Sequence, residues 1–176
     1  TLKNLLNFSE SKSNVGLVGC RLIDGSGLFL PESKRNFPKI SISIQKFIGI
    51  GTKYYANQIE ELDSKPVDVI PGALMFLRRS LYNELSGFDE DFFMYAEDAE
   101  LSFRLSKLGK LAYFEDVNFI HLIKENEFRR TEYSWVNRFS IQIQVSNLLW
   151  IRKSYGVIAF LLIYLNYSVI APIFWI

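Results

Sequence analysis

Three carboxylates lie within four residues of one another at the start of a predicted helix. Glu97, Asp98 and Glu100 occur in the stretch FMYAEDAELSFRL, and the aromatic-rich sequence GFDEDFFMYA overlaps its beginning. Acids are favoured in the first turn of any helix, because the backbone N–H groups there are unpaired and the helix dipole is positive. A partly desolvated carboxylate beside aromatic side chains is also the kind of group that acts as a general base. The cluster is therefore open to two interpretations, helix capping and proton transfer.

The spacing of the helix separates two of these acids from the third. Leu101, Leu105 and Leu108 follow the i, i+4, i+7 spacing and form one apolar stripe. Counting back three and four positions from Leu101 places Asp98 and Glu97 at the edges of that stripe. We therefore expect these two carboxylates to lie against the body of the protein.

The third acid has an ordinary partner. Glu100 lies further round the helix and precedes Arg104 by four residues, the spacing of a surface ion pair. We expect Glu100 and Arg104 to pair on the helix surface.

The elements that must position this cluster alternate between strands and helices. The sequence predicts a strand over residues 15–23, a hairpin turn at DGSG, and a strand in ALMFLRR after the Pro71–Gly72 turn. A short helix in RSLYNEL, a second helix over residues 97–108 and the β-rich stretch KLAYFEDVNFIHLI follow. Such alternation indicates an α/β layer fold rather than a helix bundle. A phosphate-binding loop at DGSG is the alternative to the hairpin, but no helix pattern follows to supply amide donors.

Composition narrows the function classes. The 176 residues, 49% hydrophobic, are enough for one domain with a core and a short extra element. The 20 Lys and Arg against 19 Asp and Glu give a net charge of +1, which provides no electrostatic footprint for nucleic acid. Cys20 is the only cysteine, which excludes an internal disulfide and a cysteine-based zinc site.

The C-terminal stretch predicts contact with a membrane. GVIAFLLIYLNYSVIAPIFWI carries no charge from Gly156 to Ile176, and its length is that needed to cross a bilayer core of about 30 Å. Arg152 and Lys153 precede it, which by the positive-inside tendency places the preceding domain in the cytoplasm. A buried core helix is the alternative.

A third segment lies between the domain and this stretch. Residues 126–155 interleave basic with aromatic side chains, as in a helix that lies in the headgroup zone of a membrane. An ordinary amphipathic helix packed on the domain explains the pattern equally well. The predicted division of the chain is therefore 1–125, 126–155 and 156–176.

The region from Val67 to His121 resembles the C-terminal half of the catalytic domain of family 2 glycosyltransferases, particularly bacterial rhamnosyltransferase-like members. The similarity extends more weakly over residues 15–122. It is carried by a Gly-Ala turn and strand, GFDEDFFMY, the Glu-Asp pair, an Arg six residues after that Asp, a Gly (Gly109) ending the helix and a His closing the next strand pair. The resemblance implies a GT-A fold, an α/β sandwich that binds a nucleotide-diphosphate sugar and a divalent metal and inverts the anomeric centre.

The same resemblance implies roles for individual residues. Asp98 matches the catalytic base, which takes the proton of an acceptor hydroxyl, and Glu97 matches a residue that orients the site or the acceptor. Gly72 and Ala73 match positions where backbone approaches the substrates, and a Cβ at Gly72 would obstruct them. Arg104 is expected to contribute to substrate binding.

The metal would be Mg²⁺ or Mn²⁺, and His121 matches a position that supplies an imidazole to it. A lone His is more often a hydrogen-bonded structural residue, and either ion requires mostly oxygen ligands. The family supplies those from an Asp-x-Asp motif on an earlier strand, and the only such triplet here, DED at residues 89–91, lies in the wrong place. We therefore expect the first half of the GT-A fold to lie upstream of Thr1 and the isolated chain to be inactive.

The leading hypothesis is an inverting glycosyltransferase at the cytoplasmic face of the membrane. It would transfer a sugar from a nucleotide-diphosphate donor to a lipid-linked polysaccharide or glycolipid acceptor. A non-catalytic, membrane-anchored interaction module that uses FRRTEYSWVNRF, or a relic of such an enzyme, is one alternative. A metal-dependent phosphoryl-transfer or hydrolytic enzyme built on Asp98 and His121 is another, and it would need further metal ligands.

Overall fold

The computed structural model describes residues 2–12, 15–37, 67–108, 110–122 and 138–170. They belong to two compact units, which are described separately. The first comprises Thr1–Phe37, Asn57–Glu90 and Glu97–Glu125, and the second comprises Pro38–Ala56, Asp91–Ala96 and Asn126–Ile176. Gly109, predicted to stop the second helix, lies outside the described residues, as do the first part of the segment 126–155 and the last six residues of the chain.

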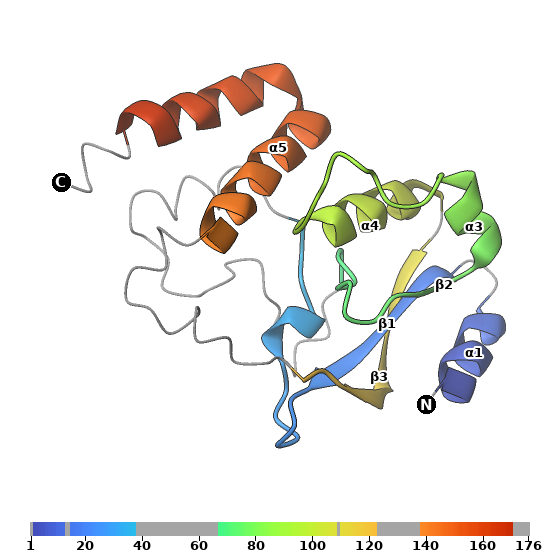
Figure 1. Cartoon of the computed structure of the whole chain (residues 1–176). Coiled ribbons are helices and arrows are strands. Elements are labelled where there is room, and N and C mark those ends of the chain that lie inside the picture. The colour runs from blue at the N-terminus through green and yellow to red at the C-terminus, as the bar shows by residue number, and fades with distance from the viewer. Residues whose placement is uncertain (1, 13–14, 38–66, 109, 123–137, 171–176) are drawn as a thin grey trace. The chain divides into compact units, whose positions relative to one another are not determined.

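The first unit is built on a three-stranded mixed sheet (Figure 1). Strand β1 (Val15–Ile23) is central, β2 (Phe76–Leu77) pairs with it antiparallel, and β3 (Lys110–Ile120) pairs with it parallel. The sequence of β1 is an apolar run that is buried over most of its length, as a strand covered on both faces should be.

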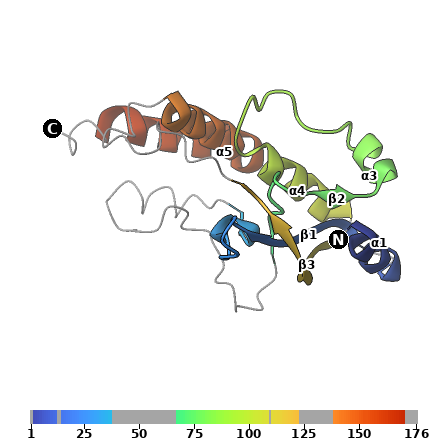
Figure 2. The same ribbon diagram turned by 60° about the horizontal axis from the view of Figure 1, so that its bottom comes forward.

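Helices cover both faces of this sheet. Helix α1 (Leu2–Ser11) packs on one face and helix α4 (Glu97–Leu108) on the other, as Figure 2 shows. From Leu17 to Cys20 the side chains of β1 follow the pleat of a strand, whereas the irregularity between Val15 and Leu17 places Val15 on the same side as Val18. The buried cluster on the α1 side contains Leu5, Val15, Val18, Cys20 and Val117, and the cluster on the α4 side contains Leu17, Ile70, Leu101 and Leu105.

A glycine in β1 allows the closest approach within this core. A Cβ added at Gly19 would lie 2.8 Å from two side-chain atoms of Ile70, which is fully buried. Real Cβ atoms do not come so near, so the packing of Ile70 over the strand depends on the missing side chain. The segment before β2 is thereby held close to the sheet.

Several predicted elements are confirmed. The strand over residues 15–23 and the helix over residues 97–108 have the expected bounds. The short helix is α3 (Arg79–Glu84), and it is followed by Ser86 and Gly87, whose φ angles of 59° and 74° are left-handed. Gly87 is the residue type that such a helix end favours.

Other predictions need correction. The DGSG turn exists, and Asp24 accepts hydrogen bonds from the N–H groups of Ser26 and Leu28, but the expected second strand is only an isolated bridge between Ile23 and Phe29. The apolar stripe of α4 is shorter than predicted, because Leu108 is 50% exposed.

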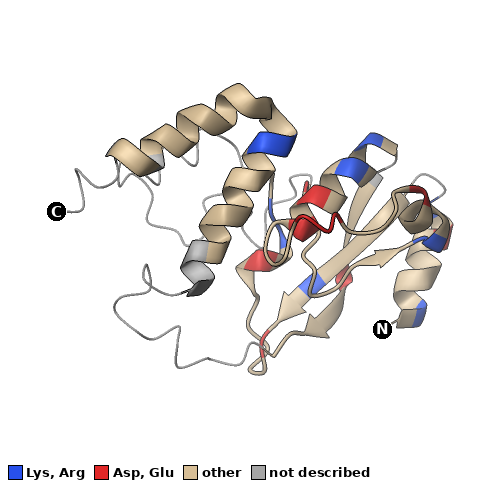
Figure 3. Cartoon of the chain, turned by 45° about the horizontal axis from the view of Figure 1, so that its top comes forward, with Lys and Arg blue, Asp and Glu red and all other residues tan. Residues whose placement is uncertain are grey.

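The second unit contains the longest helix of the described chain. Helix α5 (Arg138–Leu165) continues into the π-helical turn η4 (Asn166–Ile170), and it is interrupted at Gly156, where φ is 87° and ψ is 177°. Within it, Gln142–Leu165 is long and apolar enough to cross a membrane by length and composition. Only 17% of the most apolar 18-residue stretch of this helix is buried, whereas the core helix of a soluble protein would be mostly buried. Figure 3 shows no acidic or basic residue on α5 beyond the bend.

The first half of α5 is anchored inside its own unit. The hydroxyl of Ser146 donates to the carbonyl oxygen of Met94 at 2.6 Å. Lys153 forms an ion pair of 2.6 Å with Asp91, and its Nζ lies 5.5 Å from the ring centroid of Phe92. The aromatic segment that precedes the Glu-Asp pair is therefore tied to α5.

Candidate active site

Two left-handed residues lead into the carboxylate cluster. Tyr95 and Ala96 have φ angles of 67° and 63°, and Glu97 begins α4 directly after them. Non-glycine residues in this conformation cost roughly 1–3 kcal/mol each. Such strain persists only where the surroundings enforce it, and here it directs the chain abruptly into the helix.

Asp98 is buried, and three donors hold its carboxylate. Oδ1 accepts the N–H of Ala99 at 2.8 Å, and Oδ2 accepts the N–H of Gly72 at 3.2 Å. Oδ2 also forms an ion pair with the guanidinium of Arg35. The side chain of Asp98 is 12% exposed, so these bonds act in a region with little water. A charge-assisted bond from an arginine and two bonds from backbone amides therefore fix the position of this carboxylate.

Sequence reasoning missed Arg35. It lies 63 residues before Asp98, on the segment that follows the short 3-10 helix η1 (Pro31–Ser33). No periodicity links the two positions, and the contact forms only when the chain folds. Its Nε is buried without a hydrogen-bond partner among the described residues.

Glu97 lies beside Asp98 in a different environment. Its Oε2 is buried and has no hydrogen-bond partner among the described residues. Burial raises the pKa of Glu97, and the adjacent charge of Asp98 adds to that effect, while the bond to its own backbone amide and the charge of Arg35 oppose it. The two neighbouring acids therefore differ in how well their negative charge is compensated.

The predicted glycine of the substrate site lies next to both acids. A Cβ added at Gly72 would lie 3.9 Å from Asp98 Cβ and 3.9 Å from Glu97 Oε1, which is ordinary contact. Nothing in the part of the chain that the structure describes therefore requires glycine at position 72, and obstruction of a substrate stays a prediction. Ala73 follows in the same turn, which a bond from the Leu74 N–H to the Pro71 carbonyl closes at 3.2 Å. Its role also stays a prediction.

The predicted pair of Glu100 and Arg104 forms, but it is not on the surface. Arg104 Nε and Nη2 each lie 2.6 Å from a carboxylate oxygen of Glu100, which is only 7% exposed. Arg104 also donates to the carbonyl oxygens of Leu85 at 2.7 Å and Gly87 at 2.9 Å. Four of its five donors are used inside the protein, which favours a structural role and leaves substrate binding a prediction.

His121 lies just beyond the end of β3. Its Nδ1 is buried without a hydrogen-bond partner among the described residues and lies 3.9 Å from Glu32 Oε1. In the described part of the chain, no group of three or more His, Cys, Asp or Glu could hold a metal ion. An imidazole and one carboxylate do not complete a Mg²⁺ or Mn²⁺ site, so the described residues alone do not fit the expected metal.

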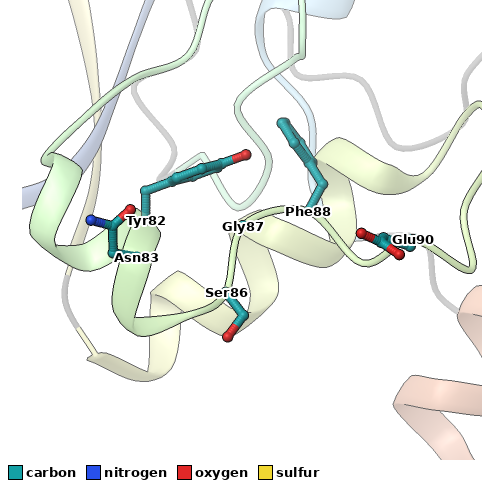
Figure 4. A pocket seen from close by; sticks show the side chains of 6 residues that line it. All are labelled: Tyr82, Asn83, Ser86, Gly87, Phe88 and Glu90. Atoms are coloured by element: carbon teal, nitrogen blue, oxygen red, sulfur yellow. The ribbon is translucent and has the colours of Figure 1, made fainter.

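An open hollow of about 510 Å³ lies at the end of α3. Figure 4 shows Tyr82 and Phe88, whose rings meet edge to face with centroids 6.1 Å apart. The remaining lining residues are Asn83, Ser86, Gly87 and Glu90. None of the residues predicted from the sequence to serve catalysis, substrate binding or metal binding lines this hollow.

The chain was compared with known proteins. The model of the family described as "Glycosyl transferase family group 2" matches residues 53–176. The chain is 28% identical over 116 residues to N-acetylglucosaminyl-diphospho-decaprenol L-rhamnosyltransferase of Mycobacterium tuberculosis (strain H37Rv). The aligned region covers 62% of this chain and 38% of that protein. It is 32% identical over 122 residues to rhamnosyltransferase WbbL of Escherichia coli (strain K12). That alignment covers 68% of this chain and 46% of the relative.

No solved structure matches the chain significantly. The chain spans less than half the length of these two curated relatives. The matched family region contains α3, α4 and β3 and hence the Glu-Asp pair. The chain therefore belongs to glycosyl transferase family group 2 and is rhamnosyltransferase-like, as its sequence predicted.

Proposed function

We propose that the protein containing this chain is an inverting glycosyltransferase with Asp98 as its catalytic base. Sugar would pass from a nucleotide-diphosphate donor to a hydroxyl of a lipid-linked saccharide. The observation that carries the proposal is the Asp98 carboxylate, buried at the start of α4 and held in place by three donors. An ionised, fixed and partly desolvated carboxylate is what a base in such a reaction requires.

The bonds to Asp98 specify which oxygen would take the proton. A carboxylate has about four lone-pair directions, two on each oxygen. Oδ2 already accepts two bonds, from Arg35 and Gly72, whereas Oδ1 accepts one, from Ala99. Oδ1 therefore retains one open lone-pair direction, and we assign the proton of the acceptor hydroxyl to it.

The transfer itself is a single displacement. The acceptor oxygen attacks the anomeric carbon while its proton moves to Oδ1 of Asp98, and the bond between that carbon and the diphosphate oxygen breaks. The nucleoside diphosphate leaves with the electron pair on the opposite face, so the anomeric configuration inverts. Glu97 is adjacent to the base and would orient the acceptor.

Replacement of Asp98 by Asn in the full-length protein tests this role. The amide keeps the size of the carboxylate but cannot take the proton, so turnover should fall by about 10²–10⁴-fold. Affinity for the nucleotide-sugar should remain within a factor of about two. Transfer of radiolabelled sugar and calorimetric titration with the donor measure the two quantities.

Asp116→Asn is the matched control, because Asp116 is exposed on β3 and should tolerate the same chemical change. Undiminished turnover in Asp98→Asn would remove Asp98 from the role of base.

The proposed acceptor and location rest on α5 and on a relative. The mycobacterial protein's name specifies a decaprenol-linked substrate, and α5 offers an apolar segment that is mostly uncovered. We propose a lipid-linked acceptor and a position at the cytoplasmic face of a membrane, with Arg152 and Lys153 at the headgroups. A divalent metal, Mg²⁺ or Mn²⁺, belongs to the same proposal, with His121 as one ligand and the others outside the described residues.

A further inference from the structure

We propose that Arg35 is a positioning residue for the sugar transfer, because it fixes the Asp98 carboxylate with Oδ1 toward the acceptor. This inference rests on the proposed role of Asp98 as base. Nothing in the family comparison assigns a role to Arg35, which lies outside the matched residues 53–176. Among the described residues, its side chain bonds to Asp98 Oδ2.

The first argument concerns rotation of the carboxylate. The terminal torsion of an aspartate is broad and roughly two-fold, so its two oxygens exchange places easily unless they are held. The backbone amides of Gly72 and Ala99 hold one oxygen each and distinguish them little. Arg35 adds a charge-assisted bond to Oδ2 alone, and that bond makes the two oxygens unequal.

The second argument concerns the rigidity of the donor. The backbone of Arg35 forms an isolated bridge with Val69, and its carbonyl accepts the N–H groups of Asp68 at 3.1 Å and Val69 at 3.0 Å. Three residues after Val69 comes Gly72, the other donor to Oδ2. The two donors therefore lie on paired segments and keep their spacing relative to each other.

The segment of Arg35 is also fastened to the central strand. The hydroxyl of buried Ser33, two residues earlier, accepts the N–H of Leu22 at 3.0 Å. The neighbouring Lys34 is buried and pairs with Glu115 at 2.6 Å. Arg35 is thus presented from a fixed backbone, as a group that orients a reacting carboxylate must be.

The third argument is charge balance. The charged side chains that face Asp98 in the described chain are Arg35, from the segment after η1, and Glu97, from its own helix. The turn before β2 contributes only the Gly72 amide. Arg35 is thus the cation that these two adjacent, partly buried carboxylates share, and its removal would leave their mutual repulsion unopposed by it.

A double-mutant cycle in the full-length protein tests the proposal, with Arg35→Met, Asp98→Asn and the double variant. If Arg35 acts through Asp98, Arg35→Met should lower kcat by about 10²-fold with little change in donor KM. The double variant should then be no slower than Asp98→Asn alone, because the residue that Arg35 positions is already disabled. Arg79→Met is the matched control, since Arg79 is exposed on α3.

Chemical rescue provides an independent readout. Guanidinium ions should restore part of the turnover of Arg35→Ala by occupying the vacated site, and they should not rescue Asp98→Asn. A merely structural role predicts a lower Tm, with normal kcat per folded molecule and no rescue, and would overturn the proposal.

Two further results would also overturn it. A double variant slower than Asp98→Asn by the full Arg35→Met factor would mean that Arg35 acts independently, for example on the donor. Full turnover in Asp98→Asn would refute the proposed function, and this inference with it. Low turnover in Asp98→Asn together with full turnover in Arg35→Met would overturn only the role of Arg35.

Discussion

Glu97 and Asp98 are adjacent acids whose surroundings treat their charges differently. Asp98 receives an arginine and two backbone amides, whereas the Oε2 of Glu97 is buried without a partner among the described residues. Pairs of acids with divergent environments commonly divide the work of a site. The carboxylate of Asp98 is therefore the one held by donors, whereas burial raises the pKa of Glu97.

The free energy of unfolding should report the burial of Glu97. Its pKa is raised by burial, so the folded protein binds the proton more tightly than the unfolded chain, whose glutamates titrate near about pH 4.3. Stability contributed by this group is consequently present at low pH and is lost as pH rises through the folded pKa. Glu97→Gln removes that loss, so the variant should be more stable than the wild type at pH 7 and similar to it near pH 4.

Urea unfolding of the chain in detergent at several pH values would measure this difference. Glu84→Gln is the control, because Glu84 is exposed on α3 and its replacement should leave the pH dependence unchanged. A Glu97→Gln variant whose stability tracks the wild type at every pH would show that the buried carboxylate carries no penalty.

At the scale of elements, Arg104 fastens α4 to the end of α3. It pairs with Glu100 within α4 and donates to two carbonyl oxygens that follow α3. Arg104→Met leaves the buried Glu100 without its cation, and this should lower the free energy of unfolding by about 3 kcal/mol. Arg104→Lys should be intermediate, because lysine keeps the charge but lacks the planar fork.

Thermal unfolding and donor KM separate the two roles considered for Arg104. A structural role predicts a lower Tm and an unchanged KM in the full-length protein. A KM raised tenfold or more at unchanged stability would support the substrate-binding role expected from the sequence.

The bend in α5 depends on one glycine. The φ and ψ of Gly156 are accessible essentially to glycine alone. Gly156→Ala should therefore let the helix run through and straighten. Spin labels at residues 145 and 165 should then move apart to about 30 Å, the rise of twenty helical residues.

Pulsed electron paramagnetic resonance would measure this distance between spin labels in a chain that carries both Val145→Cys and Leu165→Cys. The native Cys20 should not be labelled, because it is 1% exposed and burial raises its pKa to about 11. An unchanged distance in Gly156→Ala would show that packing, and not the glycine, sets the bend.

Local patterns predicted the elements best. The strand at residues 15–23 and α4 have strong patterns of their own, an apolar run and a 3.6-residue stripe, and both were found with the expected bounds. The prediction that Glu100 lies on the surface was wrong. The apolar stripe of α4 gave no sign that the end of α3 would cover that side of the helix. Arg35 was missed for a related reason, since its partner is 63 residues away and no local rule connects them.

For the whole molecule, the exposed apolar side chains of α5 predict association with lipid. Ile158 and Leu162 are 78% and 64% exposed and lie one turn apart. Lysine at both positions should abolish flotation with lipid vesicles, because each lysine costs about 3 kcal/mol in a bilayer core. Lysine at Leu2 and Leu6 of α1, which have the same spacing and are 65% and 44% exposed, should leave it intact.

Vesicle flotation at equal lipid concentration would compare the two variants with the unchanged chain. Equal loss from both would mean that any added charge, wherever it lies, prevents association. If the variant with lysine at Ile158 and Leu162 still floats with the vesicles, α5 does not carry the contact with lipid.

The break at Gly156 has a consequence for the surrounding lipid. The described residues on either side of it, 138–155 and 157–170, form two helical rods joined at a single residue. If α5 contacts lipid, as proposed, each rod can take its own tilt relative to the bilayer normal. Tilt about the glycine would then match the apolar length of α5 to bilayers of different thickness.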